Sequence, residues 1–430
     1  MASPPSPSLR RELGTFGAIM MGLGSIVGTG VFVSIGVAAG TAGSGTLIAV
    51  AIGALVATCN GLSSAQLAAN HPVSGGTYEY GYRYLTPTLG FVAGWLFLLA
   101  KTASAATAAL GFASYALNAI QVPGSAPVVP VALGAIAALT AIVLTGLRYS
   151  NRANIAIVGL ALLSLGFFVV AGLPLAISGG AERFQPVWGG ADRPLPAVLE
   201  ASALMFVAYT GYGRIATLGE EVREPSRTIP RAIIGAMVVV MVLYLSVAAV
   251  GIGAVGAEAL EPVAGQAAAP LAVAARRFAV PGSEQILSLG AIAAMLGVLL
   301  NLILGLSRVL LAMARKRDMP APLARLDAAR TTPTAATLLV GLAIAVFASS
   351  GNVGVTWSFS AFTVLVYYAL TNWAALRLSA AERLYPRWIS GAGLASCLFL
   401  AFWVEQSVWL LGVALIGVGL AWRAIRQQMR

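Results

Sequence analysis

Runs of apolar residues alternate along the chain with short polar connections. A helix needs about twenty apolar residues to cross the hydrocarbon core of a bilayer, so each run predicts a membrane-spanning helix. About twelve spans are expected on this measure, with approximate centres at Val27, Val56, Lys101, Ile136, Leu165, Ala208, Val240, Leu299, Leu339, Val364, Leu398 and Leu415. The pattern predicts an all-α integral membrane protein.

The composition agrees with this pattern and excludes a soluble domain. Of the 430 residues, 59% are hydrophobic and only 10% are charged, whereas a soluble protein carries about 25% charged residues. The net charge of +11 is dispersed between the apolar runs, so it indicates membrane topology rather than nucleic-acid binding. Cys59 and Cys397 lie in apolar runs and His71 is the single histidine, so we expect no disulfide framework, metal site or cofactor.

The basic residues predict the orientation of the spans. With the N-terminus inside, 20 of the 26 basic residues fall on cytoplasmic ends and loops. Lys101 and Arg214 fall within spans, and the outside holds Arg183, Arg193, Arg276 and Arg277. This bias predicts a multi-pass protein of the cell inner membrane with cytoplasmic tails at residues 1–12 and 425–430. The outside loop Ala257–Ser283 has an apolar middle that is compatible with a surface helix.

Glycine interrupts the first span at Gly22–Gly30, which reads G-L-G-S-I-V-G-T-G. A spanning helix satisfies its own backbone groups because lipid offers no partners, and glycine weakens such a helix. We therefore predict a helix that breaks in mid-membrane and turns its freed backbone groups toward a polar ligand. Small residues for close helix packing are the alternative.

A second interruption strengthens this prediction. The sixth span carries F-V-A-Y-T-G-Y-G at Phe206–Gly213. Interruptions in the first and sixth spans suggest two five-helix units of opposite orientation, and such inverted repeats indicate a secondary transporter with its site at the midplane. A channel is disfavoured because the sequence has no filter-like repeat or ring of charges.

Four motifs resemble those of the amino acid–polyamine–organocation permease superfamily, nearest to its bacterial permeases of the cationic-amino-acid-transporter type. They are G-S-I-V-G-T-G-V-F (Gly24–Phe32), P-V-S-G-G-T-Y-E-Y (Pro72–Tyr80), F-V-A-Y-T-G-Y (Phe206–Tyr212) with G-E-E-V-R-E-P-S-R-T-I-P (Gly219–Pro230), and S-R-V-L-L-A-M-A-R (Ser307–Arg315). The resemblance implies a LeuT-type fold with a transporter core at residues 13–376. Its repeats would span about 13–178 and 194–376, with accessory helices at 387–424.

The resemblance also implies residue roles. Amides around Gly28, Thr29 and Gly30, beside Ser25, are expected to bind the substrate carboxylate at a helix N-terminus. Carbonyls at the ends of the outer half-helices are expected to bind the α-ammonium; they belong to Ile26, Val207 and Thr210. Beside Phe206, the side chains of Tyr209 and Tyr212 are candidate gates or pocket walls, or simply packing aromatics.

Lys101 is the most informative side chain, because an ammonium in a span is costly without partners. Three roles compete for it. It could replace a sodium ion against carbonyls such as Gly24 and Val27, although relatives place that lysine on the fifth span, and here about Asn154–Leu173 has none. It could line the side-chain pocket, favouring acidic or neutral substrates. It could also carry the coupled proton.

The remaining polar groups restrict the substrate and the coupling ion. The eighth span offers only Asn301 and Ser307, which lie off one helix face, so sodium-independent transport is predicted. After the second interruption, relatives often have an acidic residue followed by a small one, whereas this chain has the pair Gly213–Arg214. An arginine facing inward would repel cations, so this difference argues against cationic substrates. Glu79 is a possible partner for an inner gate. The sequence thus predicts a proton-coupled or exchanging amino acid transporter and no enzyme.

Two alternatives remain open. A carrier of cationic amino acids or polyamines would have to tolerate Lys101 and Arg214. The second alternative is a non-transporting amino acid sensor, although a sensor usually has an extra soluble domain, which this sequence does not show. An exchanger that needs a partner subunit has the same sequence features as a transporter that works alone. The predicted partners are an amino acid, the lipid bilayer and protons, with no nucleic acid.

Overall fold

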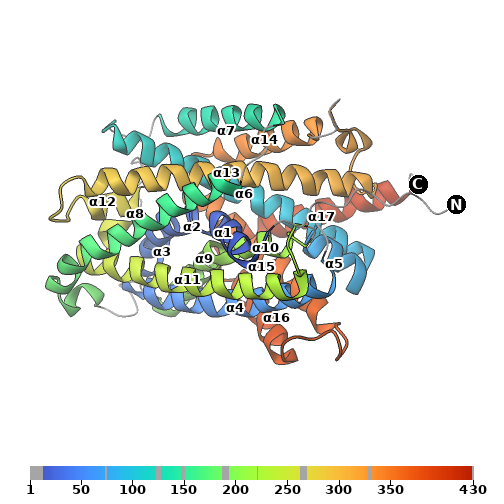
Figure 1. Cartoon of the computed structure of the whole chain (residues 1–430), viewed down its shortest axis with the longest axis horizontal. Helices are drawn as coiled ribbons and strands as arrows, with labels where there is room; N and C mark the ends of the chain where they lie inside the picture. The colour runs from blue at the N-terminus through green and yellow to red at the C-terminus, as the bar shows by residue number, and fades with distance from the viewer. Residues whose placement is uncertain are drawn as a thin grey trace.

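The computed structural model describes residues 13–72, 75–122, 127–146, 151–185, 193–219, 221–261, 269–327 and 332–428. The predicted tails therefore lie largely outside the described residues, as does Glu220 of the third motif. The longer helices run along the longest axis of the molecule (Figure 1). They are α4 (Thr46–Asn70), α6 (Pro87–Ala119), α8 (Asn151–Ser178), α11 (Pro225–Val255), α13 (Ser283–Arg315), α15 (Val353–Leu376) and α17 (Gln406–Gln428).

Shorter helices complete the described bundle. Two spans are divided: the first into α1 (Thr15–Ile26), α2 (Thr29–Phe32) and α3 (Ser34–Ala42), and the sixth into α9 (Pro194–Tyr209), η3 (Thr210–Tyr212) and α10 (Gly213–Ala216). The undivided ones are α7 (Val128–Leu144), α14 (Thr334–Ala348) and α16 (Arg387–Ala401). The connections carry η1 (Gly43–Gly45), α5 (Thr77–Tyr84), η2 (Ala181–Phe184), η4 (Glu258–Leu260), α12 (Pro270–Ala275) and η5 (Ala321–Ala324).

The helices confirm the predicted spans. Every predicted centre lies in one of these apolar helices, except Val27, which lies between α1 and α2. Among the described residues, eight helical segments are long and apolar enough to cross a membrane, and α1, α7, α14 and α16 are shorter apolar helices. The prediction of an all-α membrane protein is therefore confirmed.

The centre of the bundle consists of the spans with most polar and small residues. In the most apolar window of each span, 83% of residues in α15 and 72% in α6 are buried, against 33% in α8 and 22% in α17. Helices α8 and α17 thus present most of their surface to the outside of the bundle, where lipid would surround them. The divided spans lie beside α6 and α15 in the interior (Figure 1).

The two ends of the bundle differ in structure. Helix α5 and the end of α17 lie at one end, and α12 lies at the other (Figure 1). The loop that was expected to carry a surface helix does contain α12, but the prediction of surface exposure was wrong, because Leu271, Ala272 and Ala274 are fully buried. Apolar residues in a connection can therefore cap the bundle instead of covering its outside.

Candidate functional site

The first interruption is a true break in the helix. Helix α1 ends at Ile26, and Val27 has an extended conformation with φ −79° and ψ 103°. Gly28 is also non-helical, with φ 175° and ψ −121°, and its carbonyl accepts the first hydrogen bonds of α2 from Val31 and Phe32. The amides of Gly28, Thr29 and Gly30 therefore precede the first helical hydrogen bond and are the donors that a helix N-terminus leaves free.

The second interruption is milder than the sequence suggested. Helix α9 ends at Tyr209, and the chain passes through the 3₁₀ turn η3 into α10 without leaving helical dihedral angles. Thr210 has φ −71° and ψ 0°, and Gly213 has φ −55° and ψ −27°. The sixth span therefore tightens at this point, and its main polar contribution to the interior is the Thr210 side chain.

Two glycines allow these interruptions to touch. A Cβ atom on Gly30 would lie 2.8 Å from Cα and 2.9 Å from the carbonyl oxygen of Ala208. A Cβ atom on Gly211 would lie 2.3 Å from the carbonyl oxygen of Ser25. Real Cβ atoms do not approach backbone this closely, so each interruption needs a glycine facing the backbone of the other.

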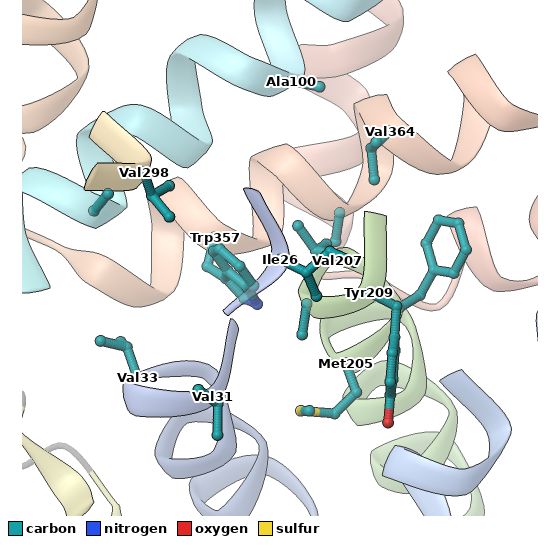
Figure 2. Packing of buried hydrophobic residues seen from close by; sticks show 14 of the residues in the cluster. Ile26, Val31, Val33, Ala100, Met205, Val207, Tyr209, Val298, Trp357 and Val364 are labelled. Carbon is teal, nitrogen blue, oxygen red and sulfur yellow. The ribbon is translucent and has the colours of Figure 1, made fainter. Parts of the chain in front are cut away.

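A cavity lies between the two interruptions. The space that a water centre can reach is about 40 Å³, enough for water but smaller than typical ligand pockets of roughly 300 Å³ or more. The cavity is lined by Ser25, Ile26, Thr29, Gly30, Lys101, Ser104, Val207, Ala208, Thr210, Gly211, Val298, Leu302 and Trp357. Figure 2 shows Ile26 and Val207, from the two interruptions, close to Trp357. Seven of the predicted substrate-binding residues therefore line one cavity: Ser25, Ile26, Thr29, Gly30, Lys101, Val207 and Thr210.

Lys101 is the only charged side chain in this lining. Its Nζ donates a hydrogen bond to Thr210 Oγ1 at 3.0 Å, and that hydroxyl donates to the Val207 carbonyl at 2.9 Å. No ion pair in the described part of the chain includes Lys101. The ammonium is thus held at the second interruption by a neutral partner and faces the cavity.

The hydroxyl of Thr29 is a second polar group at the cavity. Its Oγ1 is buried, and within the described structure it has no hydrogen-bond partner. A buried polar atom without a partner costs about 1–3 kcal/mol. Such an atom beside the free amides of the first interruption is placed to bond a polar ligand.

The carbonyls predicted for the α-ammonium already accept hydrogen bonds from the protein. The hydroxyl of Tyr244 in α11 donates a hydrogen bond to the Ile26 carbonyl at 2.8 Å, and the same hydroxyl lies 3.3 Å from the Ala208 carbonyl oxygen. Tyr368 of α15 donates to the Thr210 carbonyl at 3.1 Å, and Val207 accepts from Thr210. A ligand ammonium would therefore share these oxygens, using their second lone pairs.

Sequence reasoning missed Tyr244, Trp357 and Ser104. Tyr244 is a single aromatic hydroxyl within an apolar run, which gives little signal that it reaches two interrupted backbones. Trp357 lines the cavity while its Nε1 donates to the Leu204 carbonyl at 3.0 Å. Ser104 follows Lys101 by three residues, so the shared helix face was a usable signal.

The predicted gating aromatics lie beside the cavity and are fully buried. Tyr209 donates to the Val50 carbonyl at 3.2 Å, and its ring lies 5.1 Å from that of Tyr244. Tyr212 and Phe206 both pack on Tyr368, with ring centroids 5.3 and 5.8 Å apart. These three side chains and Gly28 are outside the cavity lining, and their predicted roles stay predictions.

Glu79 and Arg214, the other two predicted gating residues, lie outside the cavity lining. Glu79 pairs with Lys316, with Oε2 and Nζ 2.6 Å apart, so its contact is a lysine that the sequence reading did not consider. Arg214 lies in α10, is partly buried and does not line the cavity. Nearby, Asp318 accepts hydrogen bonds from Tyr78 at 2.9 Å and from Tyr82 at 2.5 Å and pairs with Arg423 of α17 at 3.3 Å.

Gly24 and Val27, the carbonyls considered for a sodium-replacing lysine, do not line the cavity. Gly24 faces α8 instead, since a Cβ there would lie 2.2 Å from Asn154 Oδ1. Asn154 Nδ2 donates to the Met20 carbonyl at 2.8 Å. The fifth span therefore presents an amide to the first span. On α13, the Ser307 hydroxyl donates to its own helix at the Ile303 carbonyl, 2.8 Å away.

A helical bundle whose first and sixth spans are interrupted beside one another is the fold of LeuT-type secondary transporters. The structure is similar to that of MhsT in complex with L-phenylalanine, with a TM-score of 0.64 and 17% sequence identity over 91% of this chain and 98% of that one. This likeness shows the fold, and it confirms the predicted LeuT-type architecture.

The sequence pattern of amino acid permeases matches residues 17–428, and the chain belongs to this family. An uncharacterized transporter of Mycobacterium tuberculosis is 42% identical over 97% of this chain and 92% of its own length. The branched-chain amino acid permease BcaP of Bacillus subtilis is 28% identical over 95% of this chain and 93% of its own length. The predicted superfamily is therefore confirmed.

Proposed function

We propose that this protein is a secondary-active amino acid transporter that works by alternating access, in a cell inner membrane with both termini in the cytoplasm. The observation that carries the proposal is the cavity between two interrupted spans in a member of the amino acid permease family. Interrupted helices expose backbone donors and acceptors inside a membrane protein only where they line a cavity.

The backbone of the first interruption, together with the Val207 carbonyl of the second, is proposed to bind the head group of the amino acid. The free amides at Gly28, Thr29 and Gly30 and the unpaired Thr29 hydroxyl supply donors for the carboxylate. The carbonyls of Ile26 and Val207 supply acceptors for the α-ammonium, shared with Tyr244 and Thr210. These contacts read what all amino acids have in common.

Lys101 is proposed to recognise the substrate side chain. As the only charged group lining the described cavity, it favours neutral polar or acidic side chains and repels lysine, arginine and polyamines. Lys101 Nζ lies 3.0 Å from Thr210 Oγ1 at the cavity, whereas Gly24 and Val27, whose carbonyls a sodium-replacing lysine would contact, lie outside the lining. This placement supports the pocket-lining role over the sodium-replacing role.

Coupling is proposed to be independent of sodium, either to protons or by exchange. Support comes from α13, where the Ser307 hydroxyl bonds its own helix, and from α8, where Asn154 bonds the first span. Lys101 is the ionisable group at the cavity, so it is the candidate to carry a coupled proton.

Uptake by purified protein in liposomes tests this function. We expect counterflow of labelled neutral or acidic amino acids without sodium, and competition by unlabelled substrate but not by arginine or spermidine. Thr29→Val is expected to weaken uptake and Thr29→Ser to retain it. Uptake that requires sodium would refute the coupling proposal, and inhibition by arginine would refute the substrate class. If no amino acid is transported, the proposal is wrong, and the protein either needs a partner subunit or transports another solute.

A further inference from the structure

A second cavity, of about 630 Å³, opens at the end of the bundle opposite α5. One wall is formed by the last turns of α8 and includes Phe167, Val170, Ala171 and Leu175. The other wall is the connection between α12 and α13 (Figure 1). We call this cavity the α8 groove. It lies on the outside of the bundle, because Val170 is 73% exposed and Val280 is 42% exposed.

The α8 groove is apolar except at one end. Within its lining, Arg277 is the only charged side chain and Ser178 the only other polar one. Ser178 already donates its hydroxyl to the Leu175 carbonyl at 3.0 Å. An arginine at the rim of an apolar, outward-facing groove combines a cation with a surface for hydrocarbon.

The chain holds Arg277 in place through both of its neighbours. The Arg276 guanidinium lies 2.6 Å from Glu284 at the start of α13 and 2.5 Å from Asn118 Oδ1 at the end of α6. On the other side, the Phe278 ring is buried 5.0 Å from the ring of Phe168. Because these contacts hold both neighbours, the backbone of Arg277 is held beside the groove.

Nothing in the described part of the chain uses this charge. Arg276 is paired, whereas none of the ion pairs among the described residues includes Arg277. The side chain is exposed at the groove rim. A guanidinium in this setting prefers phosphate, to which it can donate two parallel hydrogen bonds.

We propose that the α8 groove binds an anionic phospholipid, with its phosphate on Arg277 and an acyl chain against α8. The charge complementarity and the apolar lining argue for a lipid over a soluble anion, since a soluble anion would leave the hydrocarbon wall unused. A basic residue at the membrane surface attracts an anionic lipid by about 1 kcal/mol, which corresponds to about a fivefold preference. This site does not depend on which solute the protein transports.

Native mass spectrometry of the detergent-purified protein tests the proposal. The protein is titrated with dioleoyl phosphatidylglycerol or dioleoyl phosphatidylcholine, which share acyl chains and differ in net charge. We expect the wild-type protein to bind phosphatidylglycerol about fivefold more tightly than phosphatidylcholine. Arg277→Gln is expected to abolish this preference. Arg193→Gln is the matched control, because Arg193 is an exposed arginine outside the groove lining, and it is expected to keep the preference.

Two further measurements test the hydrocarbon wall of the groove separately from its charge. Ala171→Phe fills the groove wall without changing charge, and we expect it to weaken binding of both lipids. Glycerol 3-phosphate, which has the anionic group without chains, is expected not to bind. The proposal is overturned if Arg277→Gln keeps the lipid preference, if glycerol 3-phosphate binds as tightly as the lipid, or if a co-purified polypeptide occupies the site and excludes both lipids.

Discussion

The first interruption takes Val27 and Gly28 out of helical geometry, whereas the second keeps helical dihedral angles through η3. The first therefore offers backbone amides to the cavity, and the second offers side chains, with Lys101 held on Thr210. Backbone groups are the same at every residue and suit the common head group of amino acids. Side chains differ between proteins and suit discrimination among substrates. We infer a division of labour, with binding of the substrate carboxylate at the first interruption and selectivity for the side chain at the second.

The largest effect is expected from separating the two interruptions. Gly30→Ala would place a Cβ atom 2.8 Å from Cα of Ala208, and backbone cannot yield as a flexible side chain does. Overpacking of this kind costs about 1–3 kcal/mol, so we expect amino acid counterflow to fall by about tenfold or more. Gly166→Ala on α8 is the control, because its Cβ atom would have no atom within 4 Å, and it should transport as wild type does. Equal activity of both variants would show that the interruptions need no close contact.

A smaller effect is expected from Tyr244→Phe, which leaves both interruptions intact but removes the hydroxyl between them. The Ile26 and Ala208 carbonyls would lose this donor. The hydroxyl connects the two interrupted backbones, and loss of such a buried contact costs about 1–3 kcal/mol, so we expect a less well-ordered site and about tenfold weaker substrate binding for all amino acids alike. Isothermal titration calorimetry measures this.

Tyr115→Phe is the matched control for that experiment. The Tyr115 hydroxyl is also buried and also donates to a backbone carbonyl, that of Phe32 at 2.7 Å, but it lies outside the cavity lining. It should affect thermal stability more than substrate affinity. If Tyr115→Phe weakens binding as much as Tyr244→Phe does, the hydroxyl of Tyr244 has no special role at the interruptions.

The smallest effect is expected from Thr210→Val, which removes the acceptor for Lys101 and leaves the backbone unchanged. The lost hydrogen bond is worth about 1 kcal/mol, so about a fivefold loss of affinity is expected, restricted to substrates whose side chains Lys101 binds. Thr210→Ser keeps the oxygen and should keep the affinity. Competition assays with acidic and apolar amino acids measure the difference. A uniform loss for both groups of substrates would place Thr210 with head-group recognition instead.

The spans and the site region could be predicted because their signals are local. Apolar run length locates α4, α6 and α11, and glycine spacing locates the break at Gly28. What the sequence could not show depends on three-dimensional packing. Tyr244 and the pair of Glu79 with Lys316 each join segments far apart in the chain. The helical dihedral angles around η3 are local, but two glycines in the sequence do not distinguish a tightened turn from a full break. The burial of α12 also depends on packing, because apolarity alone does not distinguish a surface helix from a buried one.

Thermal stabilisation of the purified protein by a panel of amino acids shows whether Lys101 selects the substrate side chain. Bound ligand raises the melting temperature as occupancy increases. We measure wild type, Lys101→Met, which keeps the length without the charge, and Lys101→Arg. The assay is run without sodium at about pH 5.5 and about pH 7.5, a range in which a free lysine side chain stays charged. We expect acidic or polar amino acids to stabilise wild type most, and we expect Lys101→Met to show no preference for them. If the same ligands stabilise wild type and Lys101→Met, and only the stabilisation of wild type depends on pH, Lys101 carries a proton and does not select the side chain, and the proposed selectivity is wrong.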